Sequence, residues 1–372
     1  MYLADKLERE PSFAQENKKL LEETVAGIEA ACEEYRKKAQ DRQNILVKPP
    51  GSLGKLEEIS IKLASIYRQE FYETNPKIVL AFGADHGIYE EGISTQPQEV
   101  TALAFANYAK GICSIGVLSK FMGSQVIPID VGINSDATID GVLNQKIRKG
   151  TSNFAKGQAM TRDEAILSIA LGIRIAEEHI EKGIRVIGLG EMGICNTSPS
   201  SAIVSILSGH PVEEVTGLGA GTTPSGLEHK VNTIRKGIDL NKPNADDGID
   251  VLSKVGGFEI GALVGVMLAC AHKKIPVVLD GFISYAAALI AQSLCATVTD
   301  YMLASHKSAE PASAIALEKL GLSASLDMNM RLGEGSGAAI FFGIIDAANE
   351  VYTKVATFDN SGVPIEGCEV KN

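Results

Sequence analysis

The chain has 372 residues, of which 45% are hydrophobic and 22% charged, and these fractions are typical of a globular protein with one large domain or two. A formal net charge of −11 argues against nucleic-acid partners, because no broad basic surface is available for phosphate backbones. The six cysteines form no Cys-x-x-Cys pair, and neither the charged opening segment nor the longest apolar run, residues 260–271, suits a secretory signal or a membrane span. We therefore expect a cytoplasmic protein that has no membrane segment and no zinc ribbon.

Residues 1–40 carry apolar side chains at helical spacing and predict helix. A Pro/Gly turn at residues 47–54 follows, and Ser52 is the expected cap of the next helix. Five short apolar runs then end in Gly, Asp, Ser or His, and long helix-compatible segments separate them. The runs are residues 77–87, 124–132, 184–193, 275–282 and 299–308. Buried strands that alternate with helices predict a parallel α/β sheet with a smaller helical lobe.

Polar side chains follow most of these predicted strands. They are Asp85, His86, Glu191, Asp280, Ser305, His306 and Ser308. Because ligands of open parallel sheets bind beyond the carboxyl ends of the strands, we expect a site at this edge. For Asp85 and His86, local capping and packing are expected rather than metal binding, since no other His or Cys has a matching ligand spacing.

Two glycine-rich or polar loops are candidates for phosphate binding. Residues 217–230 lead towards Lys230 and either cradle a phosphate or form a flexible turn, because their spacing fits neither a dinucleotide fingerprint nor a P-loop. Ser308, in the polar turn at residues 304–313, either caps a helix or holds a phosphate. The sequence does not separate these alternatives.

Glu191 and Glu334 are the most informative pair of residues, because each carboxylate lies inside a glycine-rich loop. Residues 188–193 have the G-x-G-x-x-G spacing of a nicotinamide-dependent dehydrogenase. Glu191 would repel a pyrophosphate there, and a turn follows where such a fold needs a helix. Cys195 has no activating neighbour in the sequence and is interpreted as a small packing residue rather than a nucleophile.

The motifs together resemble the nicotinate-nucleotide:dimethylbenzimidazole phosphoribosyltransferase family. The match extends from about residue 48 to residue 339 and includes "KPPGSLGKLE", "GADHGI", "EGIS", "PQEVT", "GLGEMGICNTS", "VGGFEIGALVGVMLACA", "VVLDGFIS", "ASHKSAEPA" and "LDMNMRLGEGSGAA". The resemblance implies a Rossmann-like parallel sheet flanked by helices, with a smaller helical domain. We expect an N-terminal helical segment, residues 1–75, in the small domain, a catalytic domain at 76–345, and a C-terminal tail, residues 346–372, packed on the small domain.

The resemblance also implies a reaction and its residues. Phosphoribose moves from nicotinate mononucleotide to an aromatic lower-ligand base, giving an α-riboside 5′-phosphate and nicotinate for cobamide biosynthesis, without a metal or other cofactor. Glu334 is implied as the catalytic base and Glu191 as the second carboxylate near the ribose. The implied donor and phosphate site contains Lys230, Ser308, Gly193, Gly219 and Asp280. The expected acceptor pocket contains Gln96, Phe105, Met192 and Leu332.

Two departures from the family pattern concern the acceptor. Thr95-Gln96-Pro97 stands where the family usually has approximately Ala-Tyr-Pro, and "GICSIG" replaces a run of small residues. The acceptor is therefore expected to be dimethylbenzimidazole or a phenol such as p-cresol. The family resemblance implies a homodimer, or a heterodimer with a paralogous subunit. A non-catalytic nucleotide-binding subunit of such a heterodimer is the alternative function.

Overall fold

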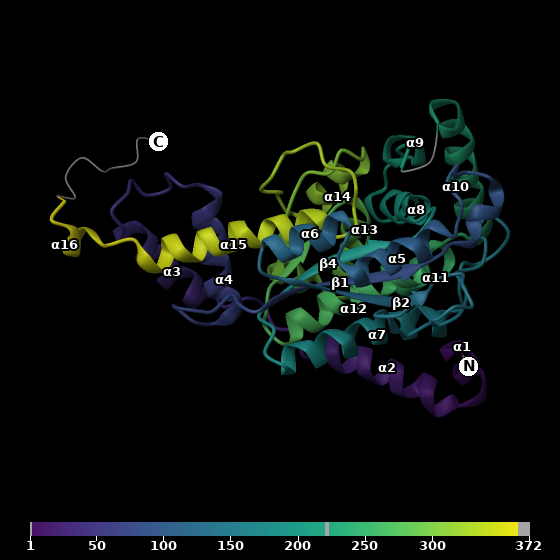
Figure 1. Ribbon diagram of the computed structural model, residues 1–372, viewed down its shortest axis with the longest axis horizontal. Coiled ribbons are helices and arrows are strands. Elements are labelled where there is room, and N and C mark those ends of the chain that lie inside the picture. Colours follow the sequence, from purple (N-terminus) through teal and green to yellow (C-terminus); the bar gives the residue numbers. More distant parts are fainter. Residues whose placement is uncertain (1, 220–222, 364–372) are drawn as a thin grey trace.

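The computed structural model describes residues 2–219 and 223–363, and its centre is one parallel sheet (Figure 1). The strands are β1 (Lys77–Ala84), β2 (Gln125–Gly132), β3 (Leu143–Asn144), β4 (Val186–Met192), β5 (Val277–Leu279) and β6 (Met302–Ala304). They are arranged in the order β3-β2-β1-β4-β5-β6, and every pairing is parallel. All five predicted strands are confirmed. The two-residue strand β3 was not predicted, because so short a segment has no periodicity.

The strand order makes the sheet Rossmann-like, as expected. β1 pairs with β2 on one side and with β4 on the other, so the chain reverses its direction of travel across the sheet between these two strands. Loops that leave β1 and β4 at their carboxyl ends therefore separate and open a crevice, which is where ligands bind in this topology.

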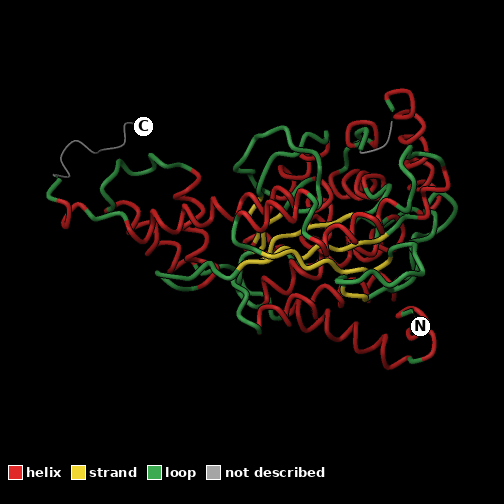
Figure 2. Tube along the Cα trace, viewed as in Figure 1, coloured by secondary structure: helices red, strands yellow, loops and turns green. Residues whose placement is uncertain are grey.

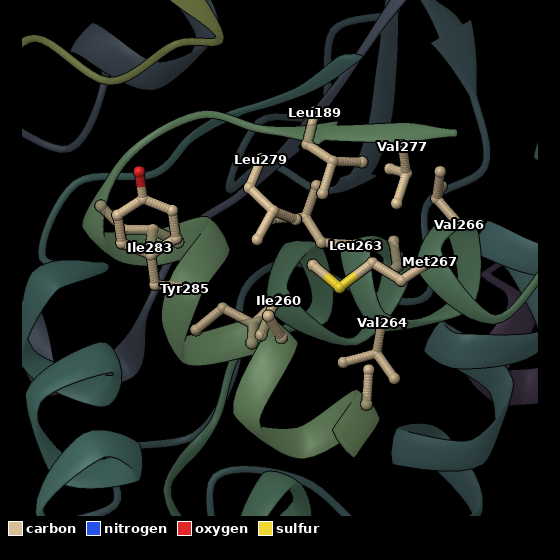
Figure 3. Close-up of a cluster of buried hydrophobic side chains, with 14 of the residues drawn as sticks. Leu189, Ile260, Leu263, Val264, Val266, Met267, Val277, Leu279, Ile283 and Tyr285 are labelled. Carbon is tan, nitrogen blue, oxygen red and sulfur yellow. The ribbon is translucent and has the colours of Figure 1, made fainter. Parts of the chain in front are cut away.

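Helices cover both faces of the sheet (Figure 2). Helices α12 (Phe258–His272) and α7 (Arg162–Glu181) lie on one face, and α15 (Ser336–Lys354), α5 (Val100–Lys110) and α6 (Ser114–Phe121) lie on the other (Figure 1). Figure 3 shows the apolar side chains between α12 and strands β4 and β5. α7 and α12 approach so closely that a Cβ on Gly172 would lie 2.0 Å from the Ala262 carbonyl oxygen. Only glycine permits that contact.

The smaller helical domain consists of α3 (Glu33–Ile45), α4 (Lys55–Tyr67), the carboxyl-terminal part of α15, and α16 (Phe358–Ser361). It extends from one end of the sheet domain (Figure 1). Helices α1 (Leu3–Arg9) and α2 (Pro11–Ala26) pack against α7 instead, so residues 1–75 contribute to the smaller domain through α3 and α4. The boundary expected at residue 345 falls within α15. Residues 364–372 of the predicted tail lie outside the described residues.

The remaining helices connect these elements. They are α8 (Thr197–Ser208), α9 (Val212–Val215), α10 (Leu227–Asn241), α11 (Gly248–Val255), α13 (Phe282–Leu294) and α14 (Ala312–Leu320), with short 3₁₀ turns at Gly87–Glu91, Pro224–Gly226 and Ala296–Tyr301. In the described ranges, the segment Val100–Phe121 is long and apolar enough by composition to cross a membrane. It folds as two helices, α5 and α6, which are separated by a turn at Gly111.

The expectation that Ser52 caps α4 is wrong. The helix begins at Lys55 after Gly54, and no side chain caps it. Instead, the Glu57 carboxylate accepts hydrogen bonds from the backbone N–H groups of Gly51 and Leu53, at 3.0 and 2.9 Å. The carboxylate of the third helical residue thus reaches back to the turn, although it does not bond the N–H of the N-cap residue Gly54 as it would in a capping box.

Candidate active site

An open cavity of about 860 Å³ lies beyond the carboxyl ends of β4 and β5, among the neighbouring loops. Its lining includes Glu191, Asp280, His306 and Ser308, four of the polar residues predicted to converge at this edge. The predicted location of the site is therefore also where the structure has its cavity.

Three other strand-end residues lie behind this cavity. The Asp85 carboxylate accepts hydrogen bonds from the Thr101 hydroxyl and the Asn134 backbone N–H, each at 2.7 Å. His86 is buried, and its Nε2 lies 2.8 Å from the Glu259 carboxylate. Ser305 donates its hydroxyl to the Asp280 carbonyl oxygen at 2.9 Å. These groups fix the loops, as the structural interpretation of Asp85 and His86 predicted.

Glu191 is the last but one residue of β4, and its carboxyl group is buried at the cavity wall. The Asn196 side chain donates a hydrogen bond to it. Burial, followed by the negative charges of Asp280 and Glu259, raises the pKa of Glu191 to about 8. The carboxyl group is therefore mostly protonated near pH 7 when the cavity holds no ligand.

Glu334 lies immediately before α15 and faces the same cavity. Burial raises its pKa, the Tyr108 hydroxyl opposes that shift, and the Asp280 charge adds to it. The backbone at Glu334 is left-handed, with φ of 66°, and is flanked by Gly333 and Gly335 at 79° and 94°. Three consecutive residues in this region are disfavoured unless neighbouring groups hold them.

Glycines in β4 bring the two carboxylates together. A Cβ on Gly190 would lie 2.5 Å from the Glu334 carbonyl oxygen, and a Cβ on Gly333 would lie 2.9 Å from Glu191 Oε1. Gly188 and Gly190 are strand residues that let the Glu334 loop and α15 pack on β4. The G-x-G-x-x-G spacing at residues 188–193 is therefore packing within a strand, and not the turn that a dinucleotide needs.

Lys230, on α10, is buried at the wall of the same cavity. Its ammonium group donates to Thr197 Oγ1 at 2.8 Å and to the Gly217 carbonyl oxygen at 3.0 Å. Burial lowers its pKa to about 8, and the charge of Glu310 opposes that shift. Among the residues that the structure describes, Lys230 forms no ion pair within 4.0 Å, so a buried cation faces the cavity with neutral partners.

The other residues predicted for the donor and phosphate site all line the cavity, but their contacts differ. Gly193, Gly219 and Ser308 line the cavity, and a Cβ on Gly219 would lie 3.2 Å from Lys230 Nζ. Ser308 does not cap α14, whose first residue is Ala312. Asp280 lines the cavity, but its carboxylate accepts hydrogen bonds from three backbone N–H groups at the start of α15. Residues 220–222 of the predicted glycine loop lie outside the described residues.

Three of the four residues predicted for the acceptor pocket line the cavity: Gln96, Met192 and Leu332. Phe105 does not. It is fully buried on α5, where its ring contacts Tyr108 and lies so close to β1 that a Cβ on Gly83 would be 2.5 Å away. A large aromatic residue looks the same in sequence whether it faces a ligand or a strand, which explains the error.

Two supporting residues were not identified from the sequence. The side chain of Asn196, just before α8, holds Glu191, and the side chain of Thr197, the first residue of α8, holds Lys230. Tyr108 forms no hydrogen bond of normal geometry within the described ranges, yet it lies close enough to Glu334 that each group shifts the other's pKa. Asn196 and Thr197 follow Glu191 in the same motif, which is the signal that could have found them.

Cys195 fits the packing role that was predicted for it. It is partly buried, and desolvation raises the pKa of its thiol to about 12, so the thiolate is scarce at neutral pH. Within the described part of the chain, no group of three or more His, Cys, Asp or Glu side chains is placed to hold a metal ion.

Known proteins share the sequence and the fold of this chain. A family model described as phosphoribosyltransferase matches residues 28–363. The chain is 53% identical over 340 residues to a nicotinate-nucleotide–dimethylbenzimidazole phosphoribosyltransferase of Clostridioides difficile, a match that covers 91% of this chain and 98% of that one. An enzyme of the same name from Desulforamulus reducens is 46% identical over 346 residues, with 92% and 99% covered. The crystal structure of the Thermus thermophilus enzyme of that name matches with a TM-score of 0.84 at 34% identity, over 90% of this chain and 99% of that chain.

Proposed function

The chain belongs to the nicotinate-nucleotide–dimethylbenzimidazole phosphoribosyltransferase family, whose members are pentosyltransferases, and from that premise we propose its reaction. Phosphoribose moves from nicotinate mononucleotide to an aromatic lower-ligand base. The products are an α-riboside 5′-phosphate, for cobamide biosynthesis, and nicotinate. The observation that carries the proposal is the cavity itself, whose lining brings together Glu191, Glu334 and the buried Lys230.

The donor phosphate belongs on the Lys230 side. A buried ammonium group whose hydrogen-bond partners are neutral oxygens is poorly compensated, and a phosphate would supply the missing negative charge. Ser308 and the backbone near Gly193 and Gly219 line the same cavity and offer further donors. The resemblance to the family supports the same assignment.

Glu334 is the proposed base that removes the acceptor's proton. A raised pKa suits this role, because it brings the carboxylate nearer in basicity to the group that it deprotonates. A positioned base contributes about 10²- to 10⁴-fold in rate. An azolium N–H or a phenol O–H becomes a competent nucleophile only when that proton leaves.

Glu191 is the proposed partner of the sugar. Its carboxyl group is mostly protonated in the empty cavity, but the positively charged ring of nicotinate mononucleotide favours the ionised form once it is bound. C1′ gains oxocarbenium character as nicotinate departs, and a carboxylate in a cavity of low dielectric stabilises that charge. Donor and acceptor are held in one cavity, which supplies the orientation that the transfer needs.

We propose dimethylbenzimidazole as the acceptor, since the relatives carry that compound in their names. Phenol and p-cresol remain the competing acceptors, because Gln96 departs from the usual family sequence and lines the cavity. A competition assay that offers the three compounds together, with the products identified by mass, tests this choice. A benzimidazole riboside phosphate as the main product supports it, and a phenolic riboside phosphate contradicts it.

The alternative is a non-catalytic nucleotide-binding subunit of a paralogous heterodimer. The departures near Gln96 favour it, and the presence of both carboxylates opposes it. Calorimetric titration with nicotinate mononucleotide, followed by an assay on the same sample, separates the two functions. Binding together with turnover by the chain alone rules the alternative out.

We also propose that the chain forms a homodimer in the cytoplasm. Leu103, Ile112, Val117 and Phe121 on α5, α6 and the turn between them expose 63%, 67%, 58% and 81% of their area. Large apolar side chains that are contiguous and exposed mark association surfaces, and a second copy of the chain would cover this face. A paralogous chain on the same face is the other outcome.

A further inference from the structure

Asp280, at the end of β5, is tied to the beginning of α15. Its Oδ2 accepts a hydrogen bond from the Gly335 N–H at 3.1 Å, and its Oδ1 accepts from Gly337 at 2.7 Å and Ala338 at 3.1 Å. These N–H groups belong to the first turn of a helix, which has no internal acceptors for them. The negative charge also lies at the positive end of the helix dipole.

The backbone of Asp280 is held in place as well. The Asp280 carbonyl oxygen accepts hydrogen bonds from the hydroxyl groups of Tyr285 and Ser305, each at 2.9 Å. Asp280 is 2% exposed, and the imidazole of His306, which is also buried, lies beside it. The carboxylate is therefore a rigid attachment point on the sheet rather than a mobile side chain.

Glu334 immediately precedes the first residue that Asp280 holds. Its left-handed backbone conformation needs external support, because the residue is not glycine. Its carbonyl oxygen lies so close to Gly190 that a Cβ there would be 2.5 Å away, so the loop packs directly on β4. From these contacts we propose that Asp280 is a positioning residue, which holds the Glu334 loop so that the Glu334 carboxylate faces the acceptor. The proposal rests on the proposed function of Glu334 as the base.

The first test is the Asp280→Asn variant of the full-length chain, assayed with nicotinate mononucleotide and dimethylbenzimidazole. The amide group keeps the shape but turns one acceptor oxygen into a donor that faces backbone N–H groups. We expect kcat to fall about 10- to 100-fold, since small displacements of a reacting group are that costly. The KM for nicotinate mononucleotide is expected to change less than about threefold, because the phosphate side of the cavity is intact.

A double-mutant cycle separates positioning from general damage. In a Glu334→Gln background there is no base left to position, so Asp280→Asn should cause little further loss of kcat. An equal loss in both backgrounds, or an unchanged kcat in the single variant, overturns the proposal. If Asp280→Asn does not fold, Asp280→Glu replaces it in the same double-mutant cycle. The same two outcomes then overturn the proposal.

Asp130 provides a matched control. It is also a buried carboxylate on a strand, it accepts hydrogen bonds from the backbone N–H groups of Gly132 and Ile133, and it lies outside the cavity lining. Asp130→Asn should lower stability and leave kcat unchanged.

Amide hydrogen exchange tests the connection independently of turnover. Exchange at Gly335, Gly337 and Ala338 should become faster in Asp280→Asn and stay unchanged in Asp130→Asn. Unchanged exchange at these amides contradicts the proposal even if the enzyme is active. Faster exchange in a protein that turns over no acceptor supports the connection and rejects the proposed function instead.

Discussion

Glu191 and Glu334 belong to different loops, and burial is the largest influence on the pKa of both carboxyl groups. Neither has an ion-pair partner within the described ranges, so each is available to a substrate. Different contacts hold the two glutamates in place. Asn196 holds Glu191 directly, whereas Glu334 is held through its backbone. Two carboxyl groups in one cavity can therefore take different roles in the reaction.

The Glu334→Gln variant tests the proposed base. Glutamine keeps the volume and cannot accept the acceptor's proton, so kcat should fall about 10²- to 10⁴-fold while nicotinate mononucleotide still binds. Steady-state kinetics and calorimetry measure the two properties. Glu318→Gln, an exposed change on α14, is the control. A Glu334→Gln enzyme with wild-type turnover removes Glu334 as the base.

Glu191 should make stability depend on pH. Its pKa is about 8 in the folded chain and about 4.5 in the unfolded chain, so the folded state binds the additional proton between these values. That stabilisation is complete below about pH 4.5 and is lost as the pH rises through about 8, with a slope of at most about 1.4 kcal/mol per pH unit. Urea denaturation across this range measures it.

Glutamine in place of Glu191 cannot titrate. As the pH rises, the free energy of unfolding of Glu191→Gln should therefore decrease less than that of the wild type. Identical pH profiles for the variant and the wild type contradict the assignment of that proton to Glu191.

At the scale of elements, the turn at residues 50–54 depends on Glu57. Its carboxylate accepts two backbone hydrogen bonds and lies 2.8 Å from the ammonium group of Lys48, and both side chains are at least nine-tenths buried. Because of this, one side chain joins the turn, the start of α4 and the preceding segment.

Glu57→Ala should lower the free energy of unfolding by about 3 kcal/mol, because the Lys48 ammonium stays buried without its partner. Chemical denaturation measures the loss. Glu58→Ala, one residue further, removes only an exposed pair with Lys55 and should cost about 1 kcal/mol or less. Equal losses in the two variants would show that the Glu57 contacts contribute no more than a surface pair.

The elements also show what could be predicted from the sequence. Short apolar runs ending in polar residues identified β1, β2, β4, β5 and β6, because a strand buried on both faces needs such a run. The capping of α4 and the split of residues 1–75 were missed, because they depend on contacts between side chains and helices that no local pattern encodes.

The candidate site, like the fold, could be predicted only in part from the sequence. The glycine-rich loops and strand ends pointed to Glu191, Glu334 and Lys230. The hydrogen bonds of Asp280 connect residues that are 55 to 58 positions apart, so its attachment to the start of α15 could be found only from the structure.

At the scale of the whole molecule, the proposed homodimer depends on the exposed face of α5 and α6. Phe121→Glu places a charge at its most exposed apolar side chain and should convert a dimer to a monomer. Analytical ultracentrifugation measures the mass. Lys120→Glu, at a charged neighbour, is the control and should remain dimeric. A wild-type chain that is monomeric at micromolar concentration contradicts the homodimer.

The proposed reaction of this cavity is the transfer of phosphoribose from nicotinate mononucleotide to an aromatic acceptor. The most direct measurement is the release of nicotinate by the purified chain, with and without dimethylbenzimidazole, phenol or p-cresol. We predict release only when an acceptor is present, in equal amount to the riboside phosphate formed. Release at the same rate without any acceptor, or no release with any of them from a folded protein that binds the nucleotide, would contradict the account.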